Sequence, residues 1–259
     1  MVTQFQELAQ SMLADFDGRT PGRCAREPVK LTVAEAYEIQ SEIARLRDER
    51  GEKIIGYKVG CTSKTIQTQL GVAEPIFGRL FASECHSSGV HLSAARFANL
   101  AIEGEIAVQL GKDLSGLSVS EEECREAIVE VFPVVELHHY VFPSTWPRAQ
   151  WLIASGGIHA GFVRAETDTR SSPLSHFAKS LSVHINDVTV GSVEDSASLI
   201  SPVDSLFWLA TRLAKFGLQL RKGQMILTGS PMNLFPVNAG DRIVVQAPLL
   251  GASRVEIDP

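Results

Sequence analysis

NLAIEGEIAVQL, residues 99–110, places two acidic residues inside a segment that otherwise has the apolar character of a buried β-strand. Carboxylates are rarely buried unless they are paired or bind a metal ion. Because side chains two residues apart in a strand share a face, Glu103 and Glu105 should point the same way, with Gly104 on the opposite face. Neighbouring carboxylates repel each other unless a cation lies between them. The stretch therefore predicts a cation site or, as the simpler alternative, the solvent face of an amphipathic strand.

A third acid, Glu136, interrupts another apolar segment, VFPVVEL. Three carboxylates from two strands would supply hard oxygen ligands, which suit Mg²⁺ or Mn²⁺ and leave coordination positions for water and substrate. His138 and His139 offer an alternative set of ligands. Adjacent residues in a strand face opposite sides, however, so both histidines cannot easily bind the same ion as Glu136. Solvated or core positions are the favoured interpretation of these two histidines.

Five collinear segments carry a family resemblance that covers nearly the whole chain. They are GYKVGCTSK, then QLGV with P-x-F-G, then IEGEIAVQL, then PVVEL, and finally RKGQMILTGSP followed by VNAGDRIVV. In this order they resemble the 2-keto-4-pentenoate hydratase / 2-oxohepta-3-ene-1,7-dioate hydratase family, within the fumarylacetoacetate hydrolase superfamily. The resemblance implies an α/β (α+β) fold, a mixed and highly curved β-roll with flanking helices and a helical N-terminal segment.

The resemblance also implies site residues. The family binds a divalent cation, Mg²⁺ or Mn²⁺, through three acids that fall here on Glu103, Glu105 and Glu136. Its lysine falls on Lys58, and its substrate-contacting hydroxyl residues fall on Ser155, in IASGG, and Ser230, in TGSP.

The chemistry of a 2-oxo acid suits this set of residue types. Its carboxylate and keto oxygens form a bidentate ligand, and a metal ion stabilises the negative charge that develops on the keto oxygen. Lys58 would balance charge, orient the substrate carboxylate or move a proton, and is assigned as the catalytic residue. The simpler alternative is a surface lysine that follows a strand.

Three departures from the family pattern concern the surroundings of this site. Ile76 stands where the family usually has an acid, and LHHYV, residues 137–141, lacks the aspartate that commonly follows the third metal glutamate. Ile153 and Ala154 replace a polar Asp-Asn pair before the serine of IASGG. These substitutions predict either a different substrate tail, with Ile76 favouring an apolar or longer one, or a member that has lost activity.

The resemblance leaves four functions open. The favoured one is a metal-dependent hydratase, a lyase that adds water to a 2-hydroxy-2,4-dienoate in the catabolism of aromatic-ring cleavage products. A decarboxylase of a 2-oxo-enedioate such as 4-oxalocrotonate would share the same metal-stabilised dienolate. A carbon–carbon hydrolase needs a water-activating His–Glu pair, and none is evident in the sequence before Lys58. A non-catalytic protein that binds 2-oxo acids is the fourth possibility.

Composition and charge argue against nucleic acid and membrane partners. The chain has 259 residues and a formal net charge of −6, so nothing suggests a basic surface for nucleic acid. Its longest apolar runs are too short to cross a bilayer, and its N-terminus does not have the pattern of a secretory signal. Four cysteines without C-x-x-C spacing indicate free thiols in a reducing cytoplasm. The family resemblance adds the expectation of a homo-oligomer.

The order of elements predicts a helical N-terminal segment, residues 1–52, and a strand-rich catalytic domain, residues 53–259, together forming one structural unit. Within the first segment, a helix is expected over roughly residues 3–16. A second helix begins at a capping box of Thr32 and Glu35 and ends at Gly51.

Two further helices and a hairpin are expected among the strands. SVSEEECREAIVEVF, residues 118–132, has a capping box of Ser120 and Glu123. SPVDSLFWLATRLAKFG, residues 201–217, begins with Ser201 as its cap and Pro202 in its first turn. VHINDVTV predicts a tight hairpin about Asn186 and Asp187.

Overall fold

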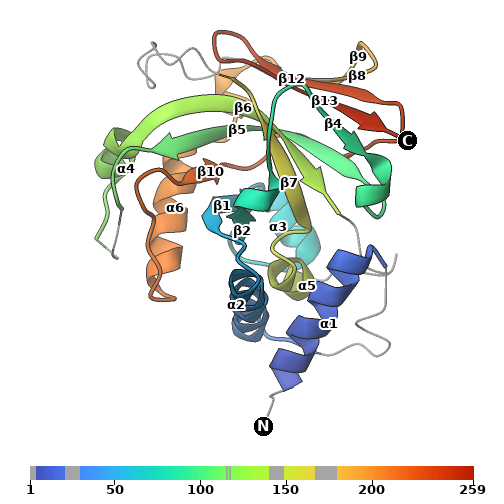
Figure 1. Ribbon diagram of the computed structural model, residues 1–259. Helices are drawn as coiled ribbons and strands as arrows, with labels where there is room; N and C mark the ends of the chain where they lie inside the picture. The colour runs from blue at the N-terminus through green and yellow to red at the C-terminus, as the bar shows by residue number, and fades with distance from the viewer. Residues whose placement is uncertain (1–3, 21–29, 115, 117, 140–148, 167–179) are drawn as a thin grey trace.

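Two β-sheets form the body of the protein in the computed structural model, which describes all residues except 1–3, 21–29, 115, 117, 140–148 and 167–179 (Figure 1). In spatial order, the strands of the large sheet are β2 (Ile76–Phe81), β1 (Ile54–Gly60), β10 (Met225–Leu227), β5 (Ala101–Leu110), β6 (Ile128–His138), β7 (His159–Arg164) and β3 (Cys85–Ser87), and β11 (Phe235–Pro236) pairs with β5. Those of the small sheet are β4 (Val90–Ser93), β13 (Gly251–Asp258), β12 (Arg242–Ala247), β8 (Leu181–Ile185) and β9 (Val188–Val193).

The large sheet is mixed and strongly curved. β1 pairs in parallel with β10 and β3 pairs in parallel with β7, whereas the other pairs of this sheet are antiparallel. Figure 1 shows β5 and β6 as long strands that arch over the helices α2 and α5. The predicted fold class, a mixed curved β-roll with flanking helices and a helical N-terminal segment, is confirmed.

The two sheets pack closely at the middle of β5. A Cβ atom added to Gly104 would lie 2.6 Å from Val183 Cγ2 and 3.3 Å from Val245 Cγ1, on strands of the small sheet. Gly104 therefore faces the small sheet, and only a residue without a side chain fits there. Because side chains alternate along a strand, Glu103 and Glu105 face away from the small sheet.

The helices are α1 (Gln4–Gly18), α2 (Val33–Glu49), α3 (Lys64–Leu70), α4 (Glu121–Ala127), α5 (Ala149–Ala154) and α6 (Pro202–Ala214). The capping boxes predicted at Thr32 and Ser120 are both present, and Ser201 caps α6 with proline in its first turn. Helix α2 is fixed to the strand-rich part by Gln40, whose Nε2 donates to Phe77 O at 2.9 Å and to Ile153 O at 2.6 Å. The division of the chain between residues 52 and 53 stays a prediction.

The prediction of a helix over residues 118–132 is wrong for the second half of that segment. It ends at Ala127, and β6 begins at Ile128. The residues that follow are rich in β-branched and aromatic side chains, and Val131 pairs with Val108 of β5. Pairing with a central strand outweighs the local helical periodicity. The hairpin turn is confirmed, because Asn186 and Asp187 have φ values of 51° and 67°, as a type I′ turn requires.

Three of the four cysteines lie in the described part of the chain, and Cys61, Cys85 and Cys124 are free thiols there. Cys24 lies outside the described residues. Among the helices that the structure describes, none combines the length and apolar character needed to cross a membrane.

Candidate metal and substrate site

The three predicted acids lie on one face of the strand pair β5–β6. Glu103 is directly opposite Glu136 in the register, and Glu105 is opposite Val134. The Glu105 and Glu136 residues are only 1% and 0% exposed, and Glu103 is partly buried. The solvent-face alternative for this strand is therefore wrong.

Curvature of the large sheet brings Lys58 to these acids. Two strands, β10 and β5, separate its strand β1 from β6, so a flat sheet would hold the two strands about 14 Å apart. Instead, Lys58 Nζ lies 2.8 Å from Glu136 Oε1, and both side chains are buried. Lys58 is not the surface lysine that the simpler alternative proposed.

Burial and mutual charge shift the pKa values in this cluster. Burial by itself lowers the pKa of Lys58, but the carboxylates of Glu136, Glu103 and Glu105 raise it above the ordinary value. Burial and the charge of Glu136 hold the pKa of Glu105 well above its ordinary value. The pKa of Glu136 lies well below its ordinary value, because Lys58, His138 and His159 outweigh the cost of burial. Of these two carboxyl groups, Glu136 is the one that its neighbours stabilise as the anion.

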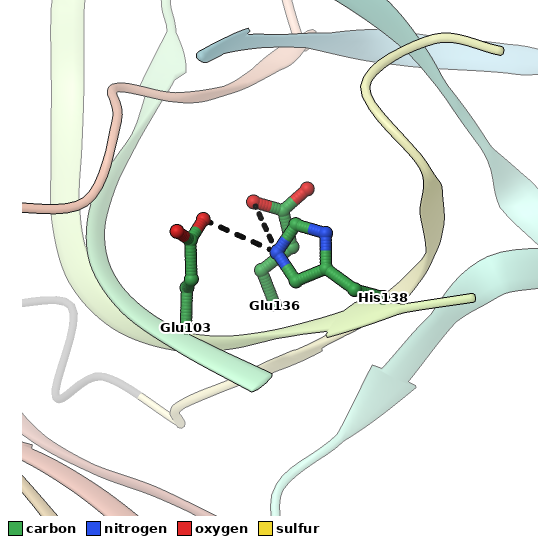
Figure 2. A group of neighbouring side chains, drawn as sticks. All are labelled: Glu103, Glu136 and His138. Carbon is green, nitrogen blue, oxygen red and sulfur yellow. Dashed lines mark hydrogen bonds and ion pairs between the residues drawn. The ribbon is translucent and has the colours of Figure 1, made fainter. Parts of the chain in front are cut away.

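The two oxygens of Glu136 have different surroundings. Oε1 lies 2.8 Å from Lys58 Nζ and 2.7 Å from His159 Nδ1. Oε2 is buried and has no hydrogen-bond partner among the described residues; His138 Nε2 lies 3.6 Å from it. One oxygen is thus held by the protein, and the other faces Glu103 and His138 (Figure 2).

His138 points into the cluster and His139 does not. His138 Nε2 lies 3.1 Å from Glu103 Oε2, and ligand atoms of Glu103, Glu136 and His138 all lie within 4.8 Å of one another. His139 Nδ1 instead accepts a hydrogen bond from Ala98 N at 3.0 Å. Burial lowers the pKa of His139 to about 4. The alternation of the two side chains is as predicted, but His138 is neither a solvated nor an ordinary core histidine.

His159 was not among the predicted site residues. In the pairing of β6 with β7, Leu137 is opposite Gly161 but His138 is opposite His159, so Ala160 is an extra residue on β7. Such a bulge moves the next side chain to the other face of a strand. The bulge places the His159 side chain against Glu136. The bulge is defined by the pairing of β7 with β6, so the sequence of β7 alone does not show it.

The hydroxyls of Ser155 and Ser230 are both engaged in local hydrogen bonds. Ser155 Oγ donates to Leu152 O at 3.0 Å and accepts from Ile158 N at 3.2 Å, in the turn after α5. Ser230 Oγ donates to Gly104 O at 3.1 Å. The residue before it, Gly229, donates its N–H to Glu105 Oε2 at 2.8 Å.

The turn after α5 also packs against Lys58. A Cβ atom on Gly157 would lie 3.2 Å from Lys58 Nζ, whereas one on Gly156 would meet nothing closer than 3.9 Å. Beside this turn, Ser155 and His159 line a cavity of about 50 Å³ together with Arg79.

Ile76 borders the same face as Lys58. It pairs with Gly60 across β1 and β2, and a Cβ atom on Gly60 would lie 3.7 Å from both Ile76 Cγ1 and Lys58 Cε. Glu74, the nearby acid, is engaged elsewhere, because it accepts from Trp208 Nε1 at 3.2 Å and pairs with Arg212 at 3.0 Å. The side of the site next to Lys58 is therefore apolar at residue 76.

Comparison with known proteins places the chain in a family. Residues 63–258 match the model of the fumarylacetoacetate (FAA) hydrolase C-terminal family. A 2-hydroxyhexa-2,4-dienoate hydratase from Comamonas testosteroni is 34% identical, over 93% of this chain and 90% of its own length. A 2-keto-4-pentenoate hydratase from Paraburkholderia xenovorans is 28% identical, over 98% of this chain and 95% of its own.

A solved structure extends the similarity to the fold of almost the whole chain. The 4-oxalocrotonate decarboxylase from Pseudomonas putida G7, complexed with magnesium and adipate, has a TM-score of 0.89 and 27% identity, covering 98% of this chain and 97% of its own. The protein therefore belongs to the fumarylacetoacetate hydrolase family.

Proposed function

We propose that this protein is a divalent-metal-dependent hydratase that acts on a 2-hydroxy-2,4-dienoate, in the breakdown of aromatic-ring cleavage products. The observation that carries the proposal is the cluster of three carboxylates, two of them fully buried, with Lys58 Nζ 2.8 Å from Glu136 Oε1. Similarity to the Comamonas testosteroni and Paraburkholderia xenovorans hydratases supports this substrate class. The enzyme is accordingly a lyase.

The residues present fit a divalent cation. Glu136 Oε2 is a buried carboxylate oxygen without a hydrogen-bond partner among the described residues, and such an atom is costly unless something binds it. Glu103, Glu105 and Glu136 would hold Mg²⁺ or Mn²⁺ through hard oxygen ligands. When bound, the cation supplies a Lewis acid for the keto oxygen of a 2-oxo acid. The magnesium of the decarboxylase from Pseudomonas putida G7 is consistent with this assignment.

Lys58 is the proposed catalytic residue. Its ammonium is fixed by Glu136 Oε1 and by the turn at Gly157, so it has one defined position beside the carboxylates. There it would orient the substrate carboxylate and hold or move a proton at Nζ. Ser155 and Ser230 are proposed substrate contacts, and each must exchange a local hydrogen bond to make one.

A decarboxylase of a 2-oxo-enedioate is the second candidate. It is favoured by the fold similarity to 4-oxalocrotonate decarboxylase, which extends over 98% of the chain. The two reactions differ in their product, so purified protein with Mg²⁺ should be supplied with a dienoate and with an oxo-enedioate. Loss of dienoate absorbance without CO₂ release supports the hydratase, and CO₂ release supports the decarboxylase. If neither reaction is seen, a non-catalytic protein that binds 2-oxo acids is the remaining candidate.

The apolar side at Ile76 bears on the substrate tail. The cation and Lys58 meet the 2-oxo acid head that all candidates share, so discrimination depends on groups farther along the substrate. We expect kcat/KM to rise from 2-hydroxypenta-2,4-dienoate to longer or substituted dienoates, and this preference to weaken in Ile76→Asp. If the shortest dienoate is best and Ile76→Asp changes nothing, Ile76 has no part in selection.

Two properties complete the proposal. The expected location is the cytoplasm, and the expected assembly is a homo-oligomer, as the family resemblance implies. Light scattering coupled to size exclusion would give the mass of the assembly, and a single-chain mass of 28.2 kDa would contradict the oligomer.

A further inference from the structure

We infer that His138 is itself a ligand of the cation, so that this site combines carboxylate oxygens with an imidazole nitrogen. The inference rests on the proposed function, because it concerns the same ion.

The positions of the donor atoms support a shared ion. His138 Nε2 lies 3.1 Å from Glu103 Oε2 and 3.6 Å from Glu136 Oε2 (Figure 2). Neighbouring ligands about 2.1 Å from an octahedral ion are separated by about 3 Å, so the two distances from Nε2 are close to those that one ion requires, and the ligand atoms of all three residues lie within 4.8 Å of one another. The single ring nitrogen Nε2 is directed at both carboxylates, which come from two strands.

A hydrogen bond from His138 to Glu103 is the simpler explanation, and it leaves too much unexplained. It would engage Nε2 and one oxygen of Glu103, but Glu136 Oε2 would stay buried with no partner among the described residues. An unsatisfied buried acceptor costs about 1–3 kcal/mol, and more when it is charged. An ion held between the three atoms would satisfy all three.

The strand register makes room for this ligand. His138 is two residues after Glu136 on β6 and therefore on the same face, opposite Ala101 of β5. Alanine at this position leaves the space beside Glu103 open to the imidazole. His159 is the other histidine of the cluster. It contacts Glu136 Oε1, the oxygen that Lys58 also binds, so it is not directed at the atoms proposed to hold the ion.

A nitrogen ligand changes which ion the site prefers. Imidazole suits first-row transition ions such as Fe²⁺, Ni²⁺ and Zn²⁺, whereas Mg²⁺ favours oxygen ligands and keeps water. Mn²⁺ also favours oxygen, but as a transition ion it accepts a nitrogen ligand more readily than Mg²⁺ does. We expect tighter binding of Mn²⁺ than of Mg²⁺. Loss of a residue that only hydrogen-bonds to a metal ligand lowers metal affinity about 10–100-fold. Because His138 is proposed as a direct ligand, its removal should lower Mn²⁺ affinity at least about 100-fold. Mg²⁺ affinity should fall by less than about tenfold, because water can replace the imidazole.

Pulsed electron paramagnetic resonance of bound Mn²⁺ tests the inference directly, without relying on activity. The full chain is freed of metal with a chelator and loaded with Mn²⁺, once with natural histidine and once with ¹⁵N-histidine. A ligating imidazole gives ¹⁴N modulation that ¹⁵N labelling replaces, and this comparison needs no mutation. The same measurement is made on His138→Ala and His138→Gln, with calorimetric affinities for Mn²⁺ and Mg²⁺.

Two other histidines supply controls. His91→Ala removes an exposed imidazole on β4, and His159→Gln removes the imidazole that contacts Glu136 Oε1. Nitrogen modulation that persists in both controls and disappears from the two His138 variants supports the inference. Bound Mn²⁺ without histidine modulation, or modulation lost only in His159→Gln, overturns it and leaves the proposed function standing. If neither Mn²⁺ nor Mg²⁺ binds the unaltered protein, the proposed function fails and the inference fails with it.

Discussion

The two faces of the strand pair β5–β6 have opposite character although they alternate along the same backbone. One face carries Glu103, Glu105 and Glu136, with a lysine and a histidine beside them. On the other face, Gly104 is in such close contact with the small sheet that an added Cβ would lie 2.6 Å from Val183 Cγ2. One face packs against the small sheet and the other carries the candidate site, so we expect a substitution on one face to leave the other face unchanged.

Glu105→Gln should have the largest effect, because it removes one of the charges proposed to hold the cation while keeping the shape of the side chain. We expect turnover to fall by at least about 1,000-fold and Mg²⁺ affinity to fall with it, while the fold persists. Kinetics and calorimetry measure the two effects, with the exposed Glu126→Gln as control. Unchanged Mg²⁺ and Mn²⁺ affinity would show that Glu105 is not a ligand.

Lys58→Met separates binding from chemistry on the same face. The change removes the ammonium 2.8 Å from Glu136 Oε1 but leaves the three carboxylates. We expect kcat to fall about 100- to 10,000-fold, as for loss of a proton-transferring group, with metal affinity nearly kept. A parallel loss of metal binding and activity would instead assign Lys58 to the integrity of the carboxylate cluster.

Gly104→Ala tests the apolar face. The new methyl group would collide with Val183, and overpacking of this kind costs about 1–3 kcal/mol of unfolding free energy. Chemical denaturation measures the loss, and the metal affinity of the folded variant should stay close to that of the unaltered protein. Adding Val183→Ala should restore part of the stability, because the two changes are coupled through one contact. Additive losses would contradict the contact.

Gly157→Ala and Gly156→Ala form a matched pair with the smallest expected effect. Both glycines have positive φ, 77° and 69°, so both substitutions carry a similar backbone strain of about 1–2 kcal/mol. Only the methyl group at residue 157 would approach Lys58 Nζ, at 3.2 Å. We expect similar stabilities but about tenfold lower kcat for Gly157→Ala than for Gly156→Ala, since displacement of a catalytic group is costly. Equal kcat values would show that the turn does not position Lys58.

Local rules in the sequence predicted several elements correctly. The capping boxes at Thr32 and Ser120 and the turn at Asn186 depend on contacts within a few residues, so their residues alone determine them. The boundary at Ile128 was missed because pairing with β5 decided it. His159 was missed for a similar reason, since its place depends on a bulge against β6.

By itself, the sequence determined that two acids of one strand share a face, that a glycine lies behind them, and that a third acid interrupts another apolar strand. These follow from the two-residue period of a strand, which is a property of the backbone alone. Only the tertiary structure decided that Lys58 reaches Glu136 across two intervening strands, and that Glu136 Oε2 is left facing His138. Distances between strands depend on their order and curvature, which arise from pairing and packing across the whole sheet.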